Sequence, residues 1–353
     1  MKLHLSILAM LLSFSASAMP WTPEQDPNQW SSTLVLNFDQ LPKTIALPTK
    51  EIPWTTTYWA DYESGVAHRW ASNFPEDFSY QPPSAARLKS MILSERNKLS
   101  PAEKWDILNS HYDYPTVAAE RARTNAQEVS WAGLCHGWSL ASLGFEEPQS
   151  FHFVNAEGIE MVLNSTDIKA LASRAVADQA ENDSLLLGTR CYREGRKNPT
   201  NMNSGECGGV NPGTFHLIMA NSLGLMQKPF VTNVSRDEQI WNHPVYGYES
   251  TVIGEAGPSR NASPDAVREV RVETYLYTVE MQDPLTPDPV QGTIDQPLSS
   301  VKYVYWLELN AQGKIVGGTW ETFWHPGFIW KNKNPIRTFD GLFTGLEKVL
   351  KAR

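Results

Sequence analysis

Three cysteines follow an N-terminal export signal, and their number limits how the chain can be cross-linked. Residues 1–18 combine a lysine, a short apolar run and small residues that end at Ala18, which is typical of a cleaved signal peptide. We therefore expect cleavage after Ala18 and a secreted or periplasmic protein, in a compartment where thiols tend to pair. Because three cysteines cannot all pair within one chain, one of them stays free or joins another molecule.

Cys191 and Cys207 flank a polar segment, 192–206, that is rich in turn residues and lacks helical or strand periodicity. A disulfide between them would close this loop and contribute about 3 kcal/mol in the chain-entropy account. A zinc site is the competing interpretation, but the spacing lacks the closely paired ligands that zinc usually takes. We expect the disulfide, which leaves Cys135 unpaired.

Cys135 follows a turn residue, Gly133, and precedes a run of small and apolar residues that is suited to a buried helix. A cysteine at a helix N-terminus faces the positive end of the helix dipole, which favours the thiolate. The pattern therefore indicates a candidate nucleophile. The alternative is a buried and inert cysteine, which is common among free cysteines.

A cysteine nucleophile usually needs a histidine base and a third group that orients the ring. His216 lies in the apolar run 214–220, which predicts a buried strand entered through the glycine-rich turn before it. The next predicted strand, 230–234, would pair antiparallel with it and carries Asn233, whose carboxamide can orient an imidazole. Asp237 is the carboxylate alternative, although it can also cap the segment that follows.

The order cysteine, histidine, asparagine is that of papain-like enzymes, in which a thiol-bearing helix packs on an antiparallel sheet. The oxyanion would be held by the backbone N–H of Cys135 and a second donor. The Trp131 indole N–H is the candidate for that donor, with the Gln127 amide as the alternative.

Short helical and strand patterns alternate along the chain, which favours an α+β fold. Ser100 with Glu103 predicts a capping box that opens a helix, and residues 301–309 and 314–320 predict a hairpin. We divide the chain into residues 1–18, a Pro/Trp-rich and helical region 19–110, and a catalytic region 111–353.

Charge and hydropathy restrict the partners. The formal net charge is −9, and basic residues do not interleave with aromatic ones, so we do not expect nucleic acid as a partner. Beyond the signal, no stretch reaches the roughly 20 apolar residues that a membrane span needs.

Several segments resemble the transglutaminase elicitor family, secreted enzymes of oomycetes with bacterial relatives. The resemblance is carried chiefly by Trp-Ala-Gly-Leu-Cys-His-Gly-Trp around Cys135 and by the segment 211–216, and further by residues 100–106, 165–171, 239–245 and 317–326. It implies a transglutaminase-type core with Cys135 as the nucleophile and His216 as the base. The thiolate would attack a glutamine side-chain amide, form a thioester, and pass the acyl group to a lysine amine. The implied partners are proteins that offer glutamine and lysine side chains.

The resemblance also implies a carboxylate partner for the histidine and a calcium requirement. Asp167 is a candidate carboxylate, although its place before an apolar run favours helix capping. For calcium, the sequence offers no EF-hand-like loop, and Asp61, Glu63 and Asp77 are scattered carboxylates.

Two other functions share part of this pattern. A papain-like cysteine peptidase or amidase would use the same thiol and base but accept water instead of an amine. Trp131 and Trp138 flank Cys135 and could exclude water, which favours transfer over hydrolysis. A non-enzymatic secreted recognition protein is the third possibility.

Overall fold

The computed structural model describes residues 21–70, 74–189, 208–237, 239–282 and 297–353. Short 3₁₀ turns dominate the first fifty described residues, and α-helices follow them. The α-helices are α1 Phe74–Asp77, α2 Ala85–Ser90, α3 Leu93–Arg96, α4 Pro101–Leu108, α5 Pro115–Arg123, α6 Cys135–Gly144, α7 Ser165–Asp183 and α8 Pro212–Met219.

Most of the strands form one curled antiparallel sheet, with a separate hairpin of β2 and β3. The strands are β1 Thr44–Ala46, β2 Phe151–Val154, β3 Glu160–Leu163, β4 Ser184–Gly188, β5 Phe230–Asn233, β6 Asn242–Ala256, β7 Arg268–Val279, β8 Leu298–Leu309, β9 Ile315–Trp320 and β10 Phe328–Asn332. Among the described residues the order is β4-β10-β5-β6-β7-β8-β9, and β1 pairs with part of β6. The predicted hairpin of residues 301–309 and 314–320 is confirmed as β8 and β9.

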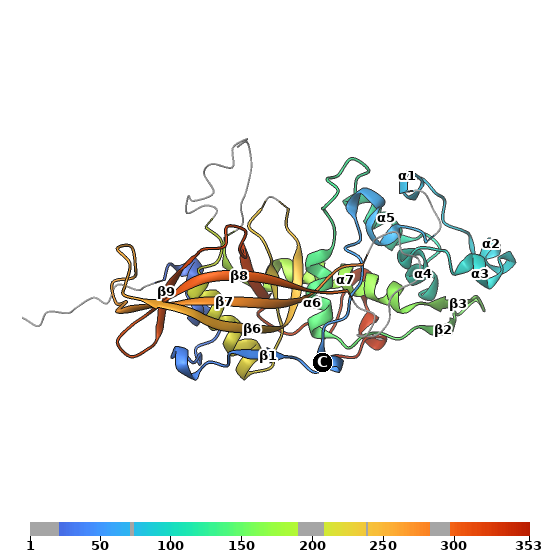
Figure 1. Ribbon diagram of the computed structural model, residues 1–353. Coiled ribbons are helices and arrows are strands. Elements are labelled where there is room, and N and C mark those ends of the chain that lie inside the picture. The colour runs from blue at the N-terminus through green and yellow to red at the C-terminus, as the bar shows by residue number, and fades with distance from the viewer. Residues whose placement is uncertain (1–20, 71–73, 190–207, 238, 283–296) are drawn as a thin grey trace, which may run out of the picture.

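The long strands β6 to β9 extend toward one end of the molecule, and α1 to α5 with the β2–β3 hairpin lie at the other (Figure 1). Helices α6 and α7 lie between these two parts. Helix α6, which begins at Cys135, packs against β5 and β6. The predicted α+β class with a cysteine-bearing helix on an antiparallel sheet is therefore confirmed.

Two hydrophobic clusters form the core. The first contains Cys135, Trp138 and the buried apolar side chains of α7, and the second contains Phe215 and the inward face of β6 to β8. Side chains alternate between the faces of a strand. In β10, Trp330 accordingly belongs to the first cluster and its neighbour Ile329 to the second. At β10 and β5 the sheet therefore separates the two clusters.

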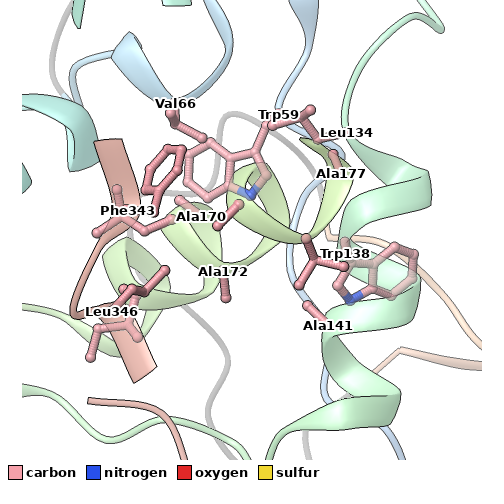
Figure 2. Close-up of a cluster of buried hydrophobic side chains, with 14 of the residues drawn as sticks. Trp59, Val66, Leu134, Trp138, Ala141, Ala170, Ala172, Ala177, Phe343 and Leu346 are labelled. Atoms are coloured by element: carbon pink, nitrogen blue, oxygen red, sulfur yellow. The ribbon is translucent and has the colours of Figure 1, made fainter. Parts of the chain in front are cut away.

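The first cluster depends on a close approach of α6 to α7. Gly137 faces α7, and a Cβ at this position would overlap the carbonyl oxygen of Ser173. Figure 2 shows Trp138 and Ala141 of α6 beside the small side chains of α7, including Ala177. Small residues on both helices bring the backbones together and fix where α6 begins relative to the sheet.

Helix α4 is joined to α7 by a buried ion pair. The predicted capping box of α4 is confirmed: the Glu103 N–H donates to Ser100 Oγ at 3.1 Å, and the Ser100 N–H donates to Glu103 Oε2 at 3.0 Å. One residue further, Lys104 Nζ lies 2.6 Å from Asp167 Oδ2, and both side chains are fully buried. Residues on both sides of position 110 thus share one core, although the domain division itself stays a prediction.

The strand predicted for residues 214–220 is wrong, because this run forms α8 and the π-helical turn after it. An apolar run of this length fits a buried helix as well as a buried strand. Asn211 and Pro212 carried the missed signal: the Asn211 side chain accepts from the Gly213 N–H at 2.8 Å, and proline occupies the first helical position.

The parts of the chain that the structure describes contain no helix with both the length and the apolar character needed to cross a bilayer.

Candidate active site

Cys135 is the first residue of α6 and is almost completely buried, with 4% of its surface exposed. Its sulfur lies beside the chain that enters β6. The Asn242 side-chain N–H₂ donates to Sγ at 3.4 Å, and Sγ lies 3.6 Å from the Ile240 carbonyl oxygen. The backbone N–H groups of His136 and Asn242 also interact with the sulfur. The described hydrogen-bond donors to the sulfur are therefore amides.

Aromatic side chains hold this arrangement in place. The Trp330 indole N–H donates to Asn242 Oδ1 at 2.9 Å, which turns the amide nitrogen of Asn242 toward the sulfur. Tyr58 and Trp241 make an edge-to-face contact with centroids 5.2 Å apart, and Tyr58 also anchors the loop before α6 through Ser130 O. Sequence reasoning assigned no role to Asn242 or Trp330. The signal for Asn242 was its place in the segment 239–245, one of those that resemble the family.

Burial raises the pKa of the Cys135 thiol above its ordinary value, because the charged thiolate loses its hydration. The hydrogen bonds from Asn242 and the His136 N–H act in the opposite direction and stabilise the thiolate. The nearby charge of Asp61 adds to the increase. In the free protein the thiol therefore holds its proton at neutral pH.

We expect the alkylation of Cys135 by iodoacetamide to keep accelerating to higher pH than that of a free thiol. The thiolate is the reacting species, and a raised pKa moves its formation to the alkaline side. Mass spectrometry of the Cys135 peptide across pH 6 to 10, with glutathione as reference, measures this. Asn242→Ala should move the curve further toward alkaline pH. A rate already at its plateau near pH 6 would contradict the expected pKa.

The structure does not bring His216 to Cys135. The His216 ring is buried in α8, where Nδ1 lies 2.8 Å from the Tyr305 hydroxyl and the ring contacts Phe38. Phe38 and Tyr305 both belong to the second cluster, whereas Cys135 belongs to the first. Burial lowers the pKa of His216 to about 4, so its ring stays neutral at physiological pH. These contacts indicate a structural role for His216, which lies on the side of the sheet opposite Cys135.

Asn233 lies near the thiol but does not contact an imidazole. It is the last residue of β5 and pairs in register with Asn242, so it is one strand away from the group that contacts the sulfur. Its Oδ1 accepts from the Ser235 N–H at 3.1 Å. Asp237 accepts from the Ser235 hydroxyl at 2.6 Å and from the Gln239 N–H at 3.0 Å. Both side chains thus shape the loop that leads from β5 to β6.

The Asp167 side chain caps the N-terminus of α7, as its place before an apolar run predicted. Its carboxylate accepts from the Asn164 N–H at 2.8 Å and from the Trp70 indole N–H at 2.9 Å. The remaining partner is Lys104. These contacts occupy both oxygens, so Asp167 is not available to orient a histidine.

Two further predicted residues, Trp131 and Gln127, precede α6. Trp131 is half-buried in the loop just before α6, and Gln127 is exposed in the same loop. Cys191 and Cys207 lie outside the described residues, so the disulfide stays a prediction. Among the described residues, Cys135 is a free cysteine.

The scattered carboxylates do not form a calcium site of the kind the resemblance implies. Asp61 is 2.6 Å from the Arg123 guanidinium, Asp77 is 2.7 Å from His68 Nδ1, and Glu63 is buried. Within the described ranges no three histidine, cysteine or acidic residues gather as a metal site would require. Asp61 and Asp77 instead pair with basic side chains.

Comparison with known proteins identifies the fold and the family. The chain is similar to the crystal structure of the GP42 transglutaminase from Phytophthora sojae, with a TM-score of 0.65 and 19% sequence identity, over 93% of this chain and 95% of that one. At this identity the likeness establishes the fold. A search of curated proteins found no match. The family model described as transglutaminase elicitor matches residues 27–340. The chain therefore belongs to the transglutaminase elicitor family.

Proposed function

We propose that this protein is a secreted protein-glutamine gamma-glutamyltransferase that forms isopeptide cross-links through Cys135. The observation that supports this most directly is the setting of Cys135. Its thiol lies at the first turn of a buried helix and faces amide N–H donors from Asn242 and His136. Such donors stabilise a negative charge on sulfur or on a neighbouring oxygen without a formal charge of their own.

The proposed reaction has two acyl transfers. The Cys135 thiolate attacks the side-chain carbonyl carbon of a glutamine, and the tetrahedral intermediate collapses with loss of ammonia to give a thioester. A lysine amine then attacks the thioester carbon, forms the isopeptide bond and releases the thiolate. The backbone N–H of Cys135 and the Asn242 amide are proposed to hold the oxyanion, because both lie beside the reacting sulfur.

A proton acceptor is also needed, and we assign this role to His243 in place of His216. His243 follows Asn242 in β6. Its Nδ1 lies 3.2 Å from the Val279 carbonyl oxygen and 3.4 Å from Glu280 Oε2, so a carbonyl and a carboxylate can fix the ring. Successive side chains of a strand point to opposite faces, so the His243 ring points away from the Asn242 side chain. Because the two residues are the first two of β6, we propose that the proton passes around the start of the strand through solvent, a route that His216 in the second cluster does not have.

Substitution of each histidine in turn tests whether His243 or His216 is the base. His243→Gln is expected to lower kcat by about 100-fold or more, since general base catalysis typically contributes that much. His216→Gln should leave kcat within about three-fold and lower the melting temperature, because it disturbs the contact with Tyr305. Steady-state kinetics and thermal unfolding of both variants measure this. A large loss of kcat in His216→Gln at unchanged melting temperature would restore His216 as the base.

The test of the function itself uses purified protein, a glutamine-containing protein and a fluorescent primary amine. Incorporation of the amine, with release of ammonia, is the expected result. The runner-up function is a papain-like cysteine peptidase, which has the same thiol geometry but passes the acyl group to water. Cleavage of the protein substrate without incorporation of the amine would show that the protein is a peptidase. Absence of both reactions in folded protein would favour a recognition protein without catalysis.

A further inference from the structure

A hollow lies at the opposite end of α6 from Cys135. It is a cleft of about 980 Å³, and its lining includes Leu140, Leu143 and Gly144 of α6 together with the segments 227–229 and 331–337. A helix rises 1.5 Å per residue, so Gly144 lies about 14 Å along the axis from Cys135. The cleft is distinct from the thiol site, and its volume is at the upper end of the roughly 300–1,000 Å³ of ligand pockets.

The cleft is basic on a chain whose net charge is −9. Its charged lining comprises six basic side chains and three acidic ones. They are Lys50, Lys228, Lys331, Lys333, Arg337 and Arg353, with Glu51, Glu146 and Glu147. A concentration of one sign of charge in a concave surface raises the local concentration of oppositely charged partners.

Two of the three acids are already neutralised from outside the cleft. Glu146 pairs with Lys351 at 2.7 Å, and Glu147 pairs with Lys169 at 2.6 Å; neither lysine lines the cleft. In the described part of the chain, none of the six basic side chains is within ion-pair distance of an acidic side chain. Arg353 already donates to the carbonyl oxygens of Glu51, Ile52 and Phe145, and Lys331 donates to the Trp30 carbonyl oxygen. The positive charge offered to a ligand therefore comes chiefly from Lys50, Lys228 and Lys333.

Two of these lysines, Lys228 and Lys331, are close enough to repel each other. Burial, and in addition the positive charge of Lys228, lower the pKa of Lys331. The position of Lys228 is determined by the backbone, since its N–H donates to Ser222 O at 2.7 Å and the residue before it, Gln227, is in the left-handed region at φ 53°. An anion between two such lysines would relieve their repulsion.

The carbonyl end of α6 does not cancel this charge. A helix C-terminus carries partial negative charge and would oppose an anion. Here the Gly144 carbonyl accepts from the Arg353 N–H at 3.0 Å, and the Phe145 carbonyl accepts from Arg353 Nε at 3.0 Å. The guanidinium of Arg353 thus covers the end of the helix.

We propose that this cleft binds an acidic segment of a polypeptide, with its carboxylates on the basic side chains and its apolar side chains on the floor of the cleft. The floor is apolar because Leu140, Leu143, Val176 and Ile336 contribute to it. Apolar walls match leucine-like or valine-like side chains, which an acidic glycan lacks. Glycan binding commonly relies on exposed rings, whereas the one aromatic side chain in the described lining, Phe145, is buried.

Binding is measured with the wild-type protein and a short fluorescent peptide rich in glutamate and leucine, by anisotropy at low and high salt. Lys228→Glu with Lys333→Glu is expected to weaken binding about 10-fold or more, because two attractive contacts become repulsive. High salt should weaken binding to the wild type as well. The matched control reverses two exposed lysines outside the cleft, Lys98→Glu with Lys314→Glu, and should change affinity less than about two-fold.

Three results would overturn the proposal. They are equal binding of a peptide with alanine in place of glutamate, equal loss of binding in the control variant, and binding of heparin without binding of the peptide. The peptides contain no glutamine, so this measurement is independent of catalysis. A role as an exosite rests on the proposed function: the charge-reversed variant should then raise KM for a glutamine donor protein that carries an acidic segment, at unchanged kcat for a short glutamine peptide.

Discussion

Cys135→Ser is expected to lower amine incorporation by at least about 1,000-fold while the protein remains folded. The serine hydroxyl is a much weaker nucleophile than a thiolate, and the amide donors around Sγ cannot compensate for its higher pKa. The substitution is nearly isosteric, so the buried first turn of α6 should keep its packing against β5 and β6. Steady-state incorporation of a fluorescent amine, beside thermal unfolding, measures the two effects separately.

Ser142→Ala is the matched control. Ser142 is buried in the same helix two turns after Cys135, and its hydroxyl donates to Ser139 O at 2.8 Å without contact to the sulfur. Its activity should stay within a few-fold of wild type. If Cys135→Ser retained most of the incorporation activity, the thiol would not be the nucleophile and the proposed chemistry would fail.

Lys104→Met should lower the free energy of unfolding by about 3–5 kcal/mol. Removal of one partner from a buried ion pair leaves the other charge without compensation, and the cost is of this order. Asp167 would keep its hydrogen bonds from Asn164 and Trp70 but lose the ammonium group 2.6 Å away. Urea unfolding followed by tryptophan fluorescence measures the change.

The surface pair Lys351–Glu146 gives the comparison, because its side chains are 77% and 49% exposed whereas those of Lys104 and Asp167 are 0% exposed. Lys351→Met should cost less than about 1 kcal/mol. Addition of Asp167→Asn to Lys104→Met should restore part of the loss, since it removes the unpaired charge. A cost for Lys104→Met as small as that for Lys351→Met would mean that the buried pair contributes little.

The sequence correctly predicted the features that depend on residues close together in the chain. The capping box at Ser100 and Glu103 needs only the four residues at the start of α4, and it forms as expected. The β8–β9 hairpin joins neighbouring runs of alternating residues, so its register follows from a short connection. The helix after Gly133 begins at Cys135 because small and apolar residues there suit a buried helix.

The error at His216 has a different origin. Residues 214–220 are apolar throughout, and such a run does not specify whether the chain is helical or extended. The assignment of a base then relied on the assumption that this run and residues 230–234 are adjacent strands. In the structure, β5 pairs instead with β6 and with β10, a strand nearly one hundred residues later. Pairings between strands so far apart in the chain depend on how the whole sheet packs, and the two segments alone do not specify them.

By itself the sequence determined the resemblance to the family, the free thiol candidate and the position of that thiol at a helix start, because these depend on residue types, residue counts and short runs and not on contacts between distant segments. Only the tertiary structure decided which groups meet the sulfur. Asn242 reaches Sγ because β6 begins beside α6, and Trp330 orients its amide from β10. His216 is kept away by the sheet between the two clusters. The physical reason is that contacts between distant segments follow from how a sheet and its helices share a core, and no local spacing encodes that arrangement.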